Sequence, residues 1–116
     1  INAVKKMTVN NAIAILNGSD NDATLYLKKQ TSRDIYAKFY PIVKESIVKV
    51  KLAKYWEILT QRYNQIPLSK KVNTDLAEYV TIETIEGLFV LISQEEKNIR
   101  NNPNARVSEI LQKVFK

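Results

Sequence analysis

Residues 81–100 have the sequence TIETIEGLFVLISQEEKNIR. Large apolar side chains recur in this segment at spacings of 3, 4, 3 and 7 residues, which match an α-helix with one apolar face. Glu96 occupies the one place in this heptad-like series where an apolar residue is missing, and Gly87 is small enough for close contact with another helix. The pattern predicts a long helix that is capped by Thr81, ends near Asn101 and buries Ile82, Ile85, Phe89, Ile92 and Ile99.

The rest of the chain has the same helical character. It contains only two Gly residues, and no long segment alternates apolar and polar side chains. We therefore predict an all-α fold, a compact bundle of six to seven short-to-medium helices with no sheet. The other predicted helices are a helix tail at 1–7, a helix at 9–17 between a Thr8 cap and a Gly18 stop, a short helix at 23–29, a helix from a Thr31 or Ser32 cap to Val50, and helices at 52–64, at 74–79 after an Asn73 cap, and around 107–115.

Two of these helices have further predicted features. Pro41 should kink or split the helix that reaches Val50, because proline lacks an N–H group and crowds the preceding turn. The helix at 52–64 is expected to turn one apolar side inward, made of Leu52, Tyr55 or Trp56, Leu59 and Tyr63.

The composition excludes several classes of chemistry. The 116 residues include no Cys and no His, so the chain has no zinc finger, thiol nucleophile, imidazole base or Ser-His-Asp triad. The longest apolar run, Leu88 to Ile92, is far shorter than the roughly 18 residues of a transmembrane helix. We predict a single helical domain over residues 1–116 that is not an enzyme and has no catalytic residue, no metal site and no cofactor.

Positive charge is concentrated in the middle of the chain. Residues 28–71 hold eleven Lys or Arg and three Asp or Glu, which gives this segment a net charge of +8. The whole chain has a net charge of +6, so the remaining residues sum to −2. Such a surface attracts anions, which makes an anion-binding module, for a lipid headgroup or another phosphate or acidic ligand, an alternative function. We do not expect nucleic-acid binding, because most of these cations are dispersed lysines and no nucleic-acid-binding motif is visible.

A candidate ligand or anion site lies at the end of the 52–64 helix and in the following loop. It combines a guanidinium group, an aromatic ring, amides and two ammonium groups, which are the parts used to stack against ligands and to bind anions. The alternative is structural: aromatic residues at this spacing serve as core, and paired loop lysines are simply solvated. The candidate residues are Arg62, Tyr63, Asn64, Lys70, Lys71 and Asn73.

A candidate buried polar cluster consists of Glu96 and Arg100. They are four residues apart and therefore lie on the same face of the predicted helix. In a structural role, Glu96 pairs with Arg100, Arg62 or a tyrosine hydroxyl and fixes the helix register. In a carboxylate-based enzyme, a third hypothesis, Glu96 has a raised pKa and shares a cleft with Tyr63 and Arg62.

Several local sequences, in this order, together resemble the bacterial domain-of-unknown-function family 4197. That family has no established activity or catalytic residue to carry over to this chain. The resemblance implies an exported, periplasmic or envelope-associated bacterial protein, of which the present residues form the C-terminal part. The matching segments are KKMT (5–8), AIAILNG (12–18), PIVK (41–44), RYNQIPL (62–68), KKVN (70–73), GLF (87–89) and EEKNIR (95–100).

The same resemblance bears on partners and on one helix boundary. Loss of an N-terminal part would leave an apolar groove uncovered, so we expect a homodimer through this groove, or a protein or lipid partner that fills it.

Lys51-Leu52 stands where the family has a more glycine-like helix break. The helices on either side of residue 52 are therefore either separate or partly continuous.

Overall fold

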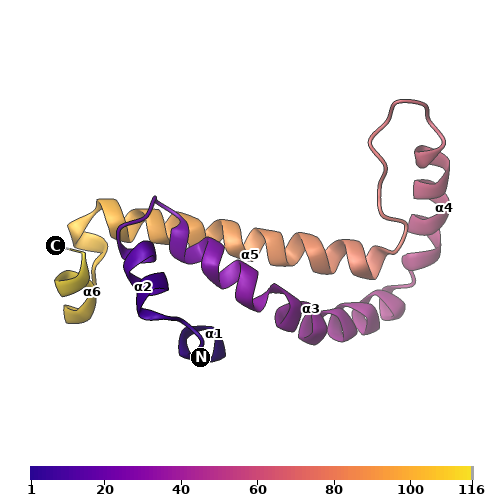
Figure 1. Cartoon of the computed structure of the whole chain (residues 1–116). Helices are drawn as coiled ribbons and strands as arrows, with labels where there is room; N and C mark the ends of the chain where they lie inside the picture. The colour runs from indigo at the N-terminus through magenta and orange to yellow at the C-terminus, as the bar shows by residue number, and fades with distance from the viewer. Residues whose placement is uncertain (116) are drawn as a thin grey trace. The chain divides into compact units, whose positions relative to one another are not determined.

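The computed structural model describes residues 1–115 and consists of helices and connecting loops (Figure 1). The all-α prediction is confirmed, and no strand occurs in the described part of the chain. Within residues 1–115, six α-helices and one 3-10 helix follow one another along the sequence. Their bounds are α1 Asn2–Lys5, α2 Val9–Leu16, α3 Asp22–Val50, α4 Ala53–Asn64, α5 Leu76–Asn101, the 3-10 helix η1 Pro103–Ala105, and α6 Glu109–Val114.

Contacts divide the described residues into two compact units. Unit 1 contains residues 1–32 and the described residues from Gly87 onward, and unit 2 contains Arg33–Glu86. Both long helices, α3 and α5, contribute to both units. The single-domain interpretation stays a prediction.

Helix α2 begins as the sequence predicts. The Thr8 hydroxyl accepts a hydrogen bond from the Asn11 N–H at 3.1 Å, and the Asn11 side chain accepts one from the Thr8 N–H at 3.2 Å. Its end differs, because Gly18 does not have the positive φ angle expected of a glycine stop. A Cβ atom on Gly18 would instead collide with the side chain of Asp22, which also accepts a hydrogen bond from the Ser19 N–H.

The predicted boundary between helices at 29–32 is wrong, because α3 is one helix of 29 residues. The Thr31 and Ser32 hydroxyls do not cap a new helix but donate to the carbonyls of Leu27 and Lys28, four residues earlier. Of the kink or split predicted at Pro41, the split does not occur, since α3 continues through this residue.

The break between α3 and α4 is sharp. Lys51 has a φ angle of 56°, in the left-handed region, and this conformation stops α3 after Val50. The two helices are therefore separate, with the second beginning at Ala53.

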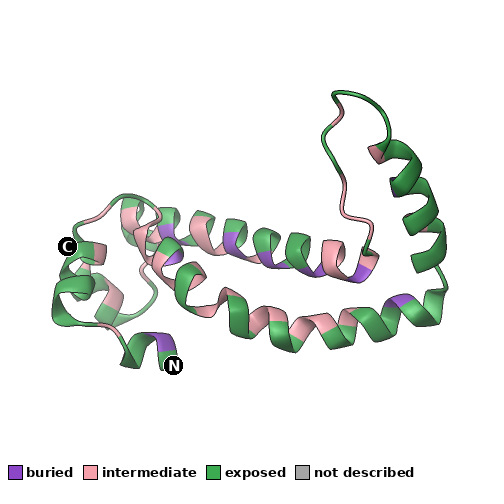
Figure 2. Ribbon diagram, turned by 45° about the vertical axis from the view of Figure 1, so that its right-hand side comes forward, coloured by how far each residue is buried: buried purple, intermediate pink, exposed green. Residues whose placement is uncertain are grey.

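Helix α5 begins five residues before the predicted cap at Thr81, so the separate helix at 74–79 does not exist. Asp75 caps α5 by accepting a hydrogen bond from the Glu78 N–H at 3.0 Å. Thr81 is fully buried and donates its hydroxyl proton to the Ala77 carbonyl. Figure 2 shows that the buried positions of α5 recur along one side of the helix.

The buried side was predicted in part. Ile85 and Phe89 are buried as expected, and Glu96 is buried with them. Ile92 and Ile99 are half-buried, the expected Ile82 is exposed, and Thr81 is buried instead. The close contact expected at Gly87 does not exist, because a Cβ atom there would meet no atom within 4 Å.

The apolar core is small for a chain of this length. Among residues 1–115, five apolar residues are buried, whereas 22 large apolar side chains are exposed. Isolated exposed apolar residues are normal in soluble proteins, but this number indicates extensive apolar surface open to contact. The buried five are Ala3, Ile47, Ala77, Ile85 and Phe89.

Candidate functional site

The Glu96 carboxylate sits at the N-terminus of α3. One oxygen accepts hydrogen bonds from the Thr24 N–H at 2.7 Å and the Thr24 hydroxyl at 2.6 Å, and the other accepts one from the Ala23 N–H at 2.9 Å. The first N–H groups of an α-helix have no partner within the helix, and the helix dipole favours a negative charge there. Glu96 therefore caps α3 from another helix.

Arg100 pairs with Glu96 and extends the cluster to α2. Its Nη2 lies 2.8 Å from the carboxylate, and its Nε donates to the same oxygen at 2.9 Å. The guanidinium group also donates to the Ile15 carbonyl at 2.6 Å and to the Leu16 carbonyl at 3.2 Å, at the end of α2. Its central carbon lies 5.4 Å from the centre of the Phe115 ring. Arg100 therefore neutralises the carboxylate and caps the C-terminus of α2.

The hydrogen bonds keep Glu96 ionised. Burial raises the pKa of this carboxyl, but the hydrogen bonds from Thr24, Ala23 and Arg100 outweigh that effect and hold the pKa below its ordinary value of 4.5. Within residues 1–115, no buried side-chain polar atom lacks a hydrogen-bond partner. The cluster thus links α2, α3 and α5 in unit 1 through polar groups that all have hydrogen-bond partners.

An apolar pocket of about 330 Å³ adjoins this cluster in unit 1. Helices α2, α3, α5 and α6 all contribute to its lining. The polar groups of Glu96 and Arg100 are occupied by each other and by the helix ends, so the pocket offers an incoming molecule mainly apolar contacts. Its apolar lining includes Ile15, Leu27, Ile92, Ile99, Leu111 and Phe115.

Three of the six candidate anion-binding residues hold the loop after α4 in place. The Asn64 side chain both donates to the Val72 carbonyl and accepts from the Val72 N–H, each at 2.7 Å. The Lys71 ammonium donates to the Asn64 carbonyl. The Asn73 carbonyl accepts a hydrogen bond from the Trp56 indole at 2.9 Å, and its side chain bonds to Glu78 at 2.8 Å. These hydrogen bonds hold the loop against α4.

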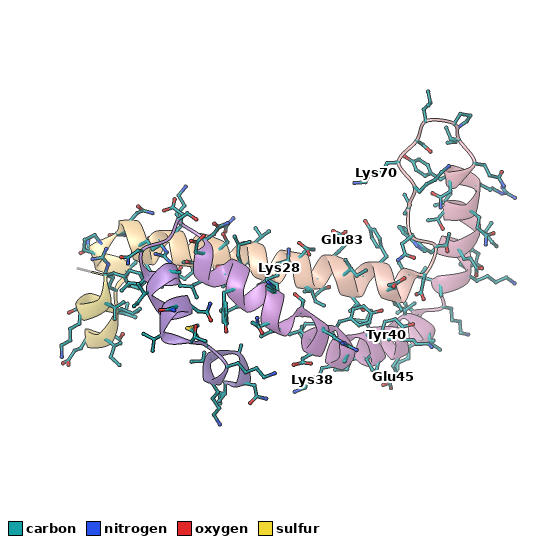
Figure 3. All side chains as sticks on the ribbon, in the orientation of Figure 1. Lys28, Lys38, Tyr40, Glu45, Lys70 and Glu83 are labelled. Carbon is teal, nitrogen blue, oxygen red and sulfur yellow. The ribbon has the colours of Figure 1, made fainter. Side chains whose placement is uncertain are left out.

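The other three candidates, Arg62, Tyr63 and Lys70, are exposed. Figure 3 labels Lys70 on the loop between α4 and α5. The structure therefore places the six residues in one region of unit 2, but half of them serve the loop rather than an open anion site. Glu96 and Arg100 belong to unit 1, and the hydrogen bonds of the Glu96 carboxylate come from unit 1.

The predicted orientation of α4 is wrong for most of its apolar residues. Of the alternatives Tyr55 and Trp56, Trp56 is the inward residue. It is half-buried, packs against Tyr79 in a tilted arrangement with ring centres 5.1 Å apart, and shares its side of the helix with the buried Thr60. The other expected inward residues, Leu52, Leu59 and Tyr63, are exposed.

The backbone donors to Glu96 could not be predicted from the sequence. The carboxylate was expected to pair with Arg100, Arg62 or a tyrosine, but its other donors belong to Ala23 and Thr24, more than 70 residues away in sequence. A signal for a helix start existed in the polar segment GSDND at 18–22. No local pattern identifies which distant carboxylate caps that start.

Residues 1–115 contain no group of three or more acidic side chains that could hold a metal ion. None of the helices in this range is both long enough and apolar enough to cross a membrane.

Comparison with family models places the chain. The model described as "Protein of unknown function (DUF4197)" matches residues 1–116. The chain belongs to this family. Comparisons with curated proteins and with solved structures found no match.

Proposed function

We propose that this family member is a non-enzymatic helical module of the bacterial envelope that acts through contacts made by its exposed apolar side chains. The observation that carries the proposal is the ratio of exposed to buried apolar residues. Large exposed apolar areas mark sites of protein or membrane contact, and 22 large apolar side chains are exposed here against a core of five.

The character of the Glu96 cluster supports a non-enzymatic role. A catalytic acid or base at neutral pH needs a pKa shifted toward the working pH and access to a substrate. Glu96 has a lowered pKa, and Thr24, Ala23 and Arg100 already occupy its oxygens. Its geometry therefore favours a structural carboxylate over a general acid or base.

Anion binding is a second candidate function, favoured by the charge of one segment. Residues 51–71 carry five Lys or Arg and one acid, Glu57, a net charge of +4. Within that segment, Lys54, Arg62 and Lys70 are exposed and available to an anionic partner.

Location in the envelope belongs to the same proposal and follows from the family resemblance. Fractionation of bacterial cells that express the natural gene tests it. We expect the protein in the periplasmic or membrane fraction, and recovery only with cytosolic markers would contradict this location.

The proposed role in contacts through exposed apolar side chains, here called the contact function, is tested by native mass spectrometry and light scattering of the gently purified chain. Binding of the neutral apolar dye Nile red is measured alongside. We expect either a discrete homodimer or a retained apolar molecule, and dye binding by the folded chain. A ligand-free monomer that does not bind the dye would overturn the proposal.

A further inference from the structure

Helix α4 presents an exposed apolar face in unit 2. Tyr55, Ile58 and Leu59 are all exposed, and their spacing of three and four residues places them on one side of the helix. Trp56 and Thr60 lie on the other side, where Trp56 bonds to the Asn73 carbonyl. Figure 2 shows α4 exposed over most of its surface. The outer face of this helix thus has no cover within unit 2.

The loop after α4 carries further exposed apolar side chains. Ile66 is exposed, and Leu68 is fully exposed with a φ angle of 63°. The left-handed region is unfavourable for leucine and suits glycine or asparagine, so residues held there are candidates for a functional role. The bonds between Asn64 and Val72 close the loop, and Leu68 lies midway between these two residues in sequence.

Cations accompany these apolar side chains. Lys54, Arg62 and Lys70 are exposed on the same helix and loop, and Arg62 lies four residues from Ile58, on the same side of α4. The one acid of residues 51–71, Glu57, lines a pocket together with Thr74 and Ala77. We call the group Tyr55, Ile58, Leu59, Ile66, Leu68, Lys54, Arg62 and Lys70 the α4 surface.

A groove next to the α4 surface has the same mixed chemistry. It has a volume of about 450 Å³ and runs between the end of α3 and the start of α4. Val48, Tyr55 and Ile58 give it apolar walls, and Lys51 and Lys54 contribute to its lining. Apolar walls beside ammonium groups suit an acyl chain with a negatively charged headgroup.

We propose that the α4 surface is a docking site for an anionic lipid bilayer. This inference rests on the proposed contact function and names its partner. A helix that lies in a membrane interface has apolar and aromatic side chains on one face, with lysine and arginine near the headgroups. The exposed residues of α4 and its loop have this composition, and their net positive charge complements anionic headgroups.

The exposed apolar side chains favour a lipid bilayer over other anionic partners. A nucleic acid would neutralise the cations but leave Leu59 and Leu68 in water, whereas a bilayer buries both kinds of side chain. An acidic protein is the remaining alternative and becomes an outcome of the test below.

The first experiment is co-sedimentation of the chain with vesicles. We expect binding to vesicles of equal parts phosphatidylcholine and phosphatidylglycerol, weak binding to pure phosphatidylcholine, and a decrease as sodium chloride is raised. Leu59→Ser with Leu68→Ser should reduce the partition coefficient by at least about tenfold. The matched control replaces two exposed leucines of unit 1, Leu25→Ser with Leu91→Ser, and should retain most of the binding.

Charge variants provide an independent comparison. Lys54→Glu with Lys70→Glu should weaken binding more than Lys5→Glu with Lys113→Glu, although both pairs change the net charge equally. Each lysine near an anionic surface changes binding by about fivefold. Equal effects of the two pairs would mean that net charge alone drives adsorption and would overturn the proposal.

The lack of native cysteine allows a direct test of insertion. An environment-sensitive dye attached through Leu68→Cys or Leu59→Cys should shift to the blue with anionic vesicles, while the same dye at Leu91→Cys should not. No shift at residues 59 and 68, with no vesicle binding, would overturn the lipid proposal in favour of a protein partner. The broader contact function would then still stand if the folded chain binds Nile red, so the two failures are distinguishable.

Discussion

Glu96→Gln lowers the free energy of unfolding by about 3 kcal/mol, because it removes one member of a buried ion pair and leaves the other charge without its partner. Arg100 would remain with its side chain only 9% exposed and no carboxylate beside it. The glutamine amide also brings a donor to a site where Thr24, Ala23 and Arg100 already donate. A donor that faces other donors costs more than the loss of a single hydrogen bond.

Chemical unfolding followed by circular dichroism measures this effect. The matched control is Glu95→Gln, which changes the neighbouring, exposed carboxyl in the same way. We expect that control to change stability by less than about 0.5 kcal/mol. If the two variants unfold at the same denaturant concentration, Glu96 is not the capping residue of α3.

Phe89→Ala should destabilise the chain by about 3–4 kcal/mol, the cost typical of removing a buried phenylalanine. Phe89 is the largest of the five buried apolar residues and is 4% exposed. Leu91, two residues later on the same helix, is 65% exposed. Leu91→Ala should therefore change the free energy of unfolding by less than about 0.5 kcal/mol.

Thermal unfolding of the two variants side by side measures the difference. A small core makes each buried group a large share of a total stability that is only about 5–15 kcal/mol for most domains. A large loss for Leu91→Ala would contradict the exposure of this leucine in solution. The concentration dependence of that loss would then identify self-association through α5.

The helical periodicity of the sequence was sufficient to predict much of the fold. Thr8 as the cap of α2 and the end of α5 near Asn101 were predicted from the sequence, whereas the break near residue 52 was left open and is decided by the structure. The errors at Thr31, Ser32 and Thr81 have one cause. A threonine or serine hydroxyl can cap a new helix or bond to the carbonyl four residues earlier, and the local sequence does not distinguish these roles.

The orientation of α4 could not be deduced from apolar spacing. Its apolar residues surround much of the helix, so several faces were equally apolar candidates for the inward side. Trp56 decides between them, because its indole donates a hydrogen bond to the Asn73 carbonyl and its ring packs against Tyr79. Both partners depend on the path of the loop, which the sequence leaves open.

The Glu96 cluster was predicted in part. Spacing alone placed Glu96 on the apolar side of its helix and Arg100 four residues away, and both are found there. The helix ends that they cap lie far away in sequence, at Thr24 and Ile15. Tertiary packing brings those ends to the cluster, and packing of this kind has no local sequence signal.

The chain combines a structural cluster around Glu96 with contact surfaces elsewhere, and the titration of Glu96 tests this division most directly. Because the folded-state pKa is lowered, ionised Glu96 contributes its full stability above the unfolded value near 4.5 and loses it as the pH falls through the folded-state pKa. NMR of the side-chain carboxyl carbon measures that midpoint in the folded protein. The structural role predicts a midpoint below 4.5. A midpoint above that value would contradict it and would return Glu96 to consideration as a general acid or base.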